Sequence, residues 1–228
     1  MLPIQDEIRA HRFPFVNYSL LALNIIVFIL ELMAGPNLEA ALYEIALIPA
    51  NVTAGFDLGD MKAIFTSMFL HAGLSHLLGN MLYLWIFGDN VEDRLGHFWY
   101  LVFYLAGGIV AAFAHVALNP NSVIPTVGAS GAIAAVLGAY LILFPQVKVL
   151  TFVPIGFFLR LTLLPASLLL GFWFVLQLFN GLLTLGLADM GGTAFWAHIG
   201  GFVFGVLIGW LCNKKSLGRK VSSWADAD

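Results

Sequence analysis

Two short motifs, far apart in the sequence, contain residue types that can hydrolyse an acyl bond. Ser130 lies in the run Gly-Ala-Ser-Gly, and His198 lies in the run Ala-His-Ile-Gly-Gly. A serine hydroxyl is a poor nucleophile until a neighbouring base takes its proton, and histidine is the usual base. Gly128 and Gly131 allow a tight turn and the close approach of a substrate. We therefore predict Ser130 as a nucleophile, His198 as its base, and the two glycines as support for the motif.

A third polar pair has the spacing expected of hydrogen-bond donors to a developing oxyanion. His76 and Asn80 are four residues apart, so they share one face of a helix. At the start of a helix, Ser130 gains from unpaired backbone N–H groups and from the positive end of the helix dipole. We predict an oxyanion hole made by the side chains of His76 and Asn80 and by the backbone N–H of Ser130. The alternative is that His76 and Asn80 only join neighbouring helices by hydrogen bonds.

The composition indicates that a lipid bilayer surrounds these residues. Of the 228 residues, 61% are hydrophobic and only 10% are charged, against roughly 25% charged in an ordinary soluble domain. So few charges cannot cover the surface of a soluble fold of this length. The single cysteine, Cys212, excludes an intramolecular disulfide framework and a cysteine-based metal site. The net charge is −3, and the sequence has no basic cluster that would suggest a nucleic-acid partner. We expect neither a cofactor nor a metal.

Hydropathy predicts an all-α polytopic membrane protein with six transmembrane helices in a single domain over residues 1–228. A helix needs about 20 apolar residues to cross a hydrocarbon core of about 30 Å. The runs without acidic or basic residues are 13–30, 63–88, 95–147, 161–188 and 190–213. The third is long enough for two helices, divided at the turn signal Asn119-Pro120-Asn121. The expected spans are roughly 14–34, 70–90, 96–118, 129–145, 162–186 and 193–213, and residues 37–47 are expected to form a helix lying in the membrane interface.

The distribution of lysine and arginine orients these spans. Of the ten cationic residues, nine fall in the segments that lie on one side when both termini are cytoplasmic, and Lys62 alone falls on the other side. This bias predicts cytoplasmic termini. No cleavage pattern follows the N-terminal stretch, so we expect no removable signal peptide. These features favour the cell (inner) membrane of a prokaryote.

Small residues at regular spacing predict which helices pack closely. Ala197, Gly201, Gly205 and Gly209 recur every four residues on the last span, which allows two helix backbones to approach. Small residues at 131, 134, 135 and 138 on the fourth span offer a matching surface. Packing these surfaces together would bring His198 close to Ser130. No acidic residue lies in the outer half of the three helices concerned, so we expect a dyad, with Gln177 and Asn180 making interhelical contacts.

If a substrate reached these residues from the lipid, it would have to pass a loosely held wall of the bundle, and the span 163–185 is the candidate. It carries the bulky residues Phe172, Trp173, Phe174 and Phe179 and has no close-contact stripe of small residues. We expect this helix to act as a lateral gate. The glycine-rich segment 186–193 is expected to cap the site.

Four motifs together resemble the rhomboid family. The run Phe69-Leu70-His71-Ala72-Gly73-Leu74-Ser75-His76-Leu77-Leu78-Gly79-Asn80-Met81 resembles the signature of the family's second helix, and Glu92-Asp93-Arg94-Leu95-Gly96 resembles the acidic turn that follows it. Gly128-Ala129-Ser130-Gly131 resembles the nucleophile motif, and Ala197-His198-Ile199-Gly200-Gly201-Phe202 resembles the helix of the catalytic histidine. Their order and spacing also match, and the resemblance extends from about Phe15 to Trp210.

The resemblance implies an intramembrane serine endopeptidase of the minimal six-helix prokaryotic form. It implies a Ser130–His198 dyad, an oxyanion hole from His76, Asn80 and the Ser130 backbone, and no cofactor. The implied substrates are single-pass membrane proteins cut within or near their transmembrane segments. Several family members have a tyrosine four residues after the nucleophile, where this chain has Ala134. Support for His198 is then expected from elsewhere, with Trp196 as a candidate.

Other functions predict different residues. A catalytically inactive, client-binding member of the family typically lacks the serine or the histidine, and this chain has both. A small transporter that used His76, Asn80 and His198 would be expected to carry charged residues at mid-membrane. An α/β-hydrolase requires a strand before Gly128, and no strand pattern precedes it. The physiological substrate and the oligomeric state are open at this point.

Overall fold

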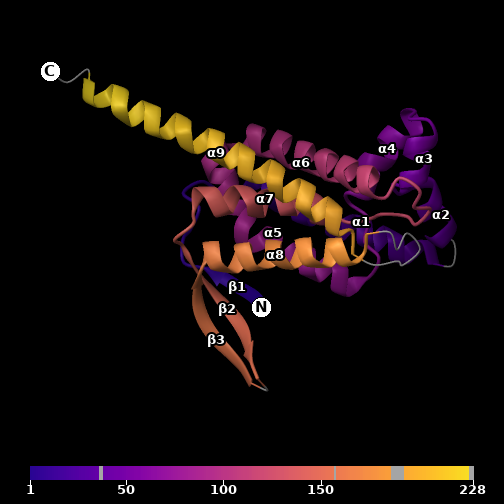
Figure 1. Cartoon of the computed structure of the whole chain (residues 1–228), viewed down its shortest axis with the longest axis horizontal. Coiled ribbons are helices and arrows are strands. Elements are labelled where there is room, and N and C mark those ends of the chain that lie inside the picture. The colour runs from indigo at the N-terminus through magenta and orange to yellow at the C-terminus, as the bar shows by residue number, and fades with distance from the viewer. Residues whose placement is uncertain (36–37, 157, 186–192, 226–228) are drawn as a thin grey trace.

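A computed structural model describes residues 1–35, 38–156, 158–185 and 193–225, and it is mostly helical (Figure 1). The longer helices form one bundle, α2 to α4 lie at one end of it, and the strands lie at the other end. The helices are α1 (Phe15–Ala34), α2 (Leu38–Ile45), α3 (Pro49–Ala54), α4 (Leu58–Ser67), α5 (Leu74–Leu95), α6 (His97–Leu118), α7 (Ser130–Leu143), α8 (Ala166–Leu183) and α9 (Phe195–Ala225). The strands are β1 (Leu2–Asp6), β2 (Lys148–Ile155) and β3 (Phe158–Pro165).

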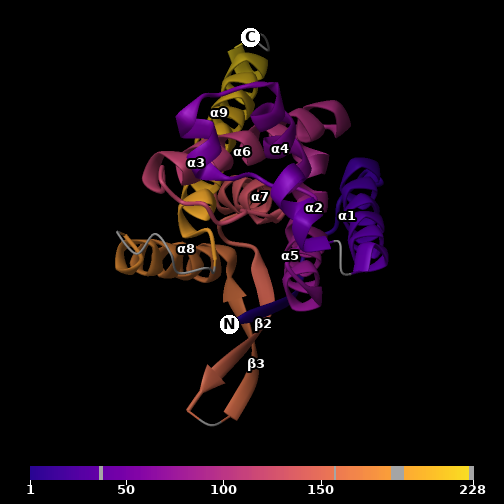
Figure 2. The same cartoon turned by 90° about the vertical axis from the view of Figure 1, so that its right-hand side faces the viewer.

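Helix α7 is the centre of the bundle. Every residue from Gly131 to Tyr140 is buried, and all of them except Tyr140 are apolar or glycine. A helix that is apolar all round has to be enclosed by others, and Figure 2 shows α7 with α5, α6, α8 and α9 around it. Because Ser130 is the first residue of α7, the serine lies at the end of the most enclosed helix in the molecule.

Helices α7 and α9 pack through glycine, as the spacing of small residues predicts. A Cβ atom added to Gly201 would collide with the carbonyl oxygen of Gly131, and one added to Gly205 would collide with that of Ala135. In the opposite direction, a Cβ on Gly138 would collide with the carbonyl oxygen of Phe202. Backbone therefore touches backbone over two turns of each helix, which fixes both the separation and the register of α7 and α9.

Several helices have the length and composition to cross a membrane. Within the described residues these are Phe15–Ala34, His97–Leu118, Ala166–Leu183 and Phe195–Lys214. Only 28% to 39% of the residues in these apolar windows are buried inside the protein, so most of their apolar surface faces outward. Helix α7 is apolar but shorter, and α5 is long but carries charged residues in its last turns. The chain is an integral membrane protein.

The all-α prediction is wrong for the segment between α7 and α8. Strands β2 and β3 form an antiparallel hairpin there, with Val149 opposite Leu164 and Phe152 opposite Leu161. Strand β1 pairs with β2, which gives the strand order β1-β2-β3. The expected span 162–186 therefore began inside β3, and α8 starts at Ala166. Hydropathy cannot distinguish a short apolar strand from the start of a helix, although the β-branched residues of β2 are typical of strands.

The segments before α5 also show what the sequence predicted and what it missed. Residues 38–45 of the expected interface helix form α2, and residue 37 lies outside the described part of the chain. The helix was predicted too long at its C-terminal end, because Leu47 pairs with Thr126 in an isolated β-bridge. Helices α3 and α4 were not expected, and α4 begins with a capping box between Asp57 and Asp60. Such reciprocal bonds satisfy the unpaired N–H groups at a helix start, so α4 is specified locally by a signal that hydropathy ignores.

Buried carboxylates attach the N-terminal residues to the bundle. The acidic turn Glu92-Asp93 receives backbone N–H bonds at the start of α1, with Glu92 accepting from Val16 (2.9 Å) and Asn17 (2.7 Å). A carboxylate is well placed at a helix N-terminus because of the unpaired donors and the helix dipole there. On β1, Asp6 accepts bonds from the Tyr140 hydroxyl (2.5 Å) and from Asn90 Nδ2 (3.0 Å), and burial raises the pKa of Asp6 to about 6.

The packing of α7 on α9 can be tested with two glycine variants. Gly205→Ala forces these backbones apart, so we expect the midpoint of thermal unfolding in detergent to fall by several degrees, since overpacking costs about 1–3 kcal/mol. Gly171→Ala is the matched control, because an added Cβ on this α8 glycine meets nothing within 4 Å. Equal midpoints for the two variants would contradict the contact.

Candidate active site

The two residues predicted as nucleophile and base are in hydrogen-bond contact. The Oγ atom of Ser130 lies 2.7 Å from Nε2 of His198. Ser130 is the first residue of α7, and His198 lies in the first turn of α9. The glycine contacts between these helices begin at Gly131 and Gly201, within one turn of the two side chains. The close packing predicted from the sequence therefore brings the pair together.

The other nitrogen of the His198 ring contacts α8. Nδ1 of His198 lies 2.8 Å from Oε1 of Gln177, and both residues are buried. Nε2 of the same glutamine donates to the backbone carbonyl of Trp173 at 3.5 Å. The ring of Trp173 lies beside His198, with 5.7 Å between ring centroids. Helix α8 thus provides both a hydrogen-bond acceptor and a packing surface for the imidazole.

The sequence predicted this surrounding of His198 only in part. Gln177 makes the interhelical contact that was expected, but its histidine partner was missed. The signal available was a buried amide in an apolar helix, which requires a partner. The ring of Trp196, the residue suggested as support for His198, lies against Gly181. Trp173 takes the position beside the ring instead.

Gly128 is required by the close approach of His76. The backbone of Gly128 has φ +132°, and an added Cβ would lie 2.7 Å from Cε1 and 2.8 Å from Nε2 of the His76 ring. Its N–H donates to the carbonyl of Ser67 at 2.8 Å, which holds the segment before Ser130 against the end of α4. Gly131 is constrained differently, because a Cβ there would lie 2.6 Å from the Cβ of Ala111 on α6. Both predicted support glycines have a steric reason to be glycine.

The second predicted donor, Asn80, is buried one turn after His76 on α5. Within the described residues its side-chain Nδ2 has no hydrogen-bond partner. An unpaired buried donor costs about 1–3 kcal/mol, so this donor, on the same face of α5 as His76, is consistent with a ligand oxygen that binds there. The start of α5 is fixed by α1, where the carboxylate of Glu31 accepts from the N–H of His71 at 3.0 and 3.3 Å.

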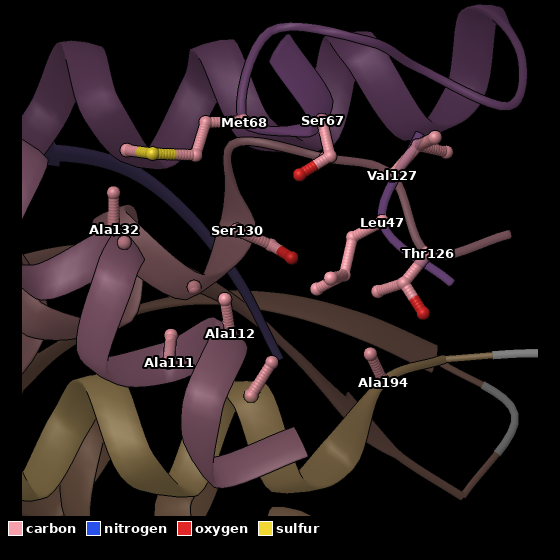
Figure 3. A pocket seen from close by; sticks show the side chains of 14 residues that line it. Leu47, Ser67, Met68, Ala111, Ala112, Thr126, Val127, Ser130, Ala132 and Ala194 are labelled. Atoms are coloured by element: carbon pink, nitrogen blue, oxygen red, sulfur yellow. The ribbon is translucent and has the colours of Figure 1, made fainter. Parts of the chain in front are cut away.

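A narrow cavity opens beside the serine. Figure 3 shows the Ser130 side chain directed into it, with Leu47, Thr126 and Ala194 on the far side. Its free volume is about 30 Å³, and most of its lining side chains are alanine or other apolar residues. Among the described residues, no three His, Cys, Asp or Glu side chains are grouped to hold a metal ion. The contact of Ser130 with His198 beside this cavity supplies a hydroxyl and an imidazole, two of the parts needed for acyl transfer.

Comparison with known proteins gives one family. The Rhomboid domain family matches residues 58–215, a range that includes all four predicted side chains of the site. The Rhomboid protease GluP of Bacillus subtilis is 35% identical over 129 residues, 56% of this chain and 24% of that protein. Rhomboid protein 1, mitochondrial, of Saccharomyces cerevisiae is 31% identical over 203 residues, 86% of this chain and 53% of that protein. Presenilin-associated rhomboid-like protein A, mitochondrial, of Danio rerio is 31% identical over 150 residues, which are 61% of this chain and 34% of that protein. The chain therefore spans about a quarter to a half of the length of these relatives.

Proposed function

The chain belongs to the rhomboid family, and we propose that it is an intramembrane serine endopeptidase that uses a Ser130–His198 dyad. The observation that carries the proposal is the 2.7 Å contact between Ser130 Oγ and His198 Nε2 at the enclosed start of α7. Serine in a membrane helix usually bonds back to a carbonyl of its own helix. A serine that instead faces a buried imidazole is arranged for proton transfer.

The proposed reaction follows from these contacts. His198 Nε2 takes the proton of Ser130 Oγ as that oxygen attacks the scissile carbonyl carbon. The negative charge that develops on the carbonyl oxygen is stabilised by the Ser130 N–H, His76 and Asn80. The imidazolium then gives its proton to the leaving amine, and the C–N bond breaks to leave an acyl-enzyme. Water, deprotonated by the same histidine, attacks the ester and releases Ser130.

Six spans place this chemistry within the bilayer. We propose that α1, α5, α6, α7, α8 and α9 cross the membrane, with both termini cytoplasmic, in the cell membrane of a prokaryote. Nine of the ten cationic residues then lie on the cytoplasmic side. The dyad lies at the opposite end of α7, in the outer half of the bundle. The proposed substrates are single-pass membrane proteins, cut within or near the transmembrane segment.

The competing proposal within the family is a client-binding protein that does not cut. Such a protein has no need of a serine and a histidine in contact, so the Ser130–His198 distance favours the protease. Cleavage assays decide between the two proposals, because a client-binding protein would retain a bound membrane protein intact.

Replacing Ser130 tests the nucleophile. We expect Ser130→Ala to abolish cleavage of a tagged single-pass substrate in proteoliposomes and to abolish labelling by a serine-reactive fluorophosphonate. His198→Ala should be nearly as severe, since a nucleophile and its base act as one unit. Ser67→Ala is the matched control, because Ser67 lines the same cavity but donates to the Ile64 carbonyl of its own helix. Cleavage by purified Ser130→Ala protein would rule out the assignment.

Removing Asn80 tests the oxyanion hole. Because the side chain of Asn80 would bond the carbonyl oxygen most strongly in the transition state, we expect Asn80→Ala to lower kcat about 10- to 1000-fold, with little change in KM. His76→Ala should act in the same direction. The control is Asn180→Ala, since Asn180 donates to the carbonyl of Leu176 on its own helix. If KM alone increased, the role of Asn80 would be restricted to joining helices.

Helix α8 is the proposed route by which substrate enters. Figure 2 shows α8 at the edge of the bundle, where it packs on α7 and α9. The structure separates its aromatic residues by face, which the sequence could not do. Phe174 stacks on Phe202 of α9 at 4.5 Å, whereas Phe172 and Phe179 are exposed. The proposed cap, 186–193, lies outside the described residues except for Thr193.

Loosening this helix should accelerate cleavage. We expect Phe174→Ala to increase the initial rate for a transmembrane substrate and to lower the thermal midpoint, because the lost packing both opens the gate and destabilises the fold. Phe172→Ala is the matched control and should change neither, since this side chain faces outward. Equal rates for the two variants, with Phe174→Ala still less stable, would argue for access elsewhere.

A further inference from the structure

We propose that Gln177 is the positioning residue of His198, whose Nδ1–H it binds so that Nε2 is left free to accept the proton of Ser130. The proposal rests on the protease function proposed above and adds a third member to its dyad. Gln177 touches neither the nucleophile nor the scissile bond in this arrangement, and it acts only through the histidine.

The orientation of the Gln177 amide follows from its second contact. Its Nε2 lies 3.5 Å from the carbonyl oxygen of Trp173, which can only accept a hydrogen bond. The NH₂ group is therefore directed toward Trp173, and Oε1 is directed toward His198, 2.8 Å from Nδ1. If the NH₂ group and Oε1 were exchanged, Oε1 would face the carbonyl oxygen of Trp173, and both atoms are acceptors.

This amide orientation determines the tautomer of His198. An amide oxygen only accepts, so Nδ1 of the imidazole must carry the hydrogen. In a neutral imidazole the other nitrogen, Nε2, is then an acceptor, and the hydroxyl of Ser130 must donate to it across 2.7 Å. The hydrogen bonds run in one direction, from serine to histidine to glutamine to the backbone. This is the protonation state that a general base requires.

Helix α8 takes this role because, apart from Ser130, the first turns of α7 carry only apolar residues and glycine. The residue four positions after Ser130 is Ala134, which is fully buried against its neighbours. Trp173 and Gln177 are four residues apart and therefore share one face of α8, and both contact the His198 ring. Within the described residues, His198 has no other side-chain hydrogen-bond partner than Ser130 and Gln177. Removing the glutamine leaves Nδ1–H unpaired and the ring free to adopt the wrong tautomer.

Two substitutions distinguish a positioning role from a packing role. Gln177→Met keeps the length of the side chain but removes the acceptor, and Gln177→Glu keeps an acceptor at the same place. A packing role predicts that Met is tolerated and that Glu, a buried carboxylate, is harmful. The positioning role predicts the reverse order of activities.

We expect Gln177→Met to lower kcat for a transmembrane substrate about 10- to 100-fold with KM nearly unchanged, the range seen when the orienting partner of another histidine is removed. Gln177→Glu should recover most of that loss. Asn180→Leu, which removes the other amide of α8, is the control for a general effect of substitutions in this helix. Wild-type activity in a folded Gln177→Met protein, or Gln177→Glu less active than Gln177→Met, would overturn the proposal.

A measurement on the unmodified protein does not depend on how well the Gln177 variants fold. In protein with ¹⁵N-labelled histidine, NMR shifts assigned by comparison with His198→Ala should show the hydrogen of neutral His198 on Nδ1. A hydrogen on Nε2 would overturn the proposal directly. Because this readout needs no catalysis, it also separates the two proposals: a protein without cleavage but with Nδ1–H would refute the protease and retain the contact of Gln177 with His198.

Discussion

The direct contact of the α7 and α9 backbones is the constraint on which the rest of the site depends. Gly201 and Gly205 lie against the carbonyl oxygens of Gly131 and Ala135, with no space for a side chain between them. Both helices begin at the same end of this contact, so Ser130 and His198 are held within a hydrogen bond of each other by rigid backbone rather than by long side chains. In a membrane, where lipid and protein interior are equally apolar, such van der Waals contact is a main force between helices. The same packing therefore stabilises the fold and aligns the two residues of the proposed dyad.

The cost of burying polar groups explains why the imidazole of His198 has a hydrogen-bond partner on each side. The imidazole of His198 is buried and must satisfy both ring nitrogens. Nε2 is in hydrogen-bond contact with Ser130, and Nδ1 is in hydrogen-bond contact with Gln177. Nδ2 of Asn80 is a buried donor without a partner among the described residues, and it is the atom that the proposed mechanism assigns to the oxyanion. Because Gln177 lies on α8, the proposed gate and the proposed base are physically linked. A movement of α8 that admits substrate would also break the contact of Gln177 with His198. Catalysis would then require α8 to return to its position against α9.

Away from the site, carboxylates perform a structural task. Glu92 receives the N–H groups of Val16 and Asn17 at the start of α1, and Glu31, near the other end of α1, receives the N–H of His71 just before α5 begins. Helix α1 is thus tied at both ends to the segments that flank and form α5, which carries His76 and Asn80. The acidic turn that contributes to the family resemblance has a physical role here as a helix cap. These bonds position the predicted oxyanion donors indirectly, by fixing the helix that carries them.

The sequence alone predicted that Ser130 and His198 meet, and the tertiary structure determined how His198 is supported. Ser130, His198, Gly128 and the stripe of small residues were predictable because a polar residue or a glycine repeat in an apolar helix has few possible roles. The helix boundary at 118 was predictable from a turn signal. The hairpin before α8 was missed, because an apolar run of strand length reads as the start of a helix. Gln177, Trp173 and Phe174 could be named from the sequence as residues of one helix. Which of them faces His198, Phe202 or lipid depends on the rotation of α8 about its own axis, and only packing against α7 and α9 sets that angle.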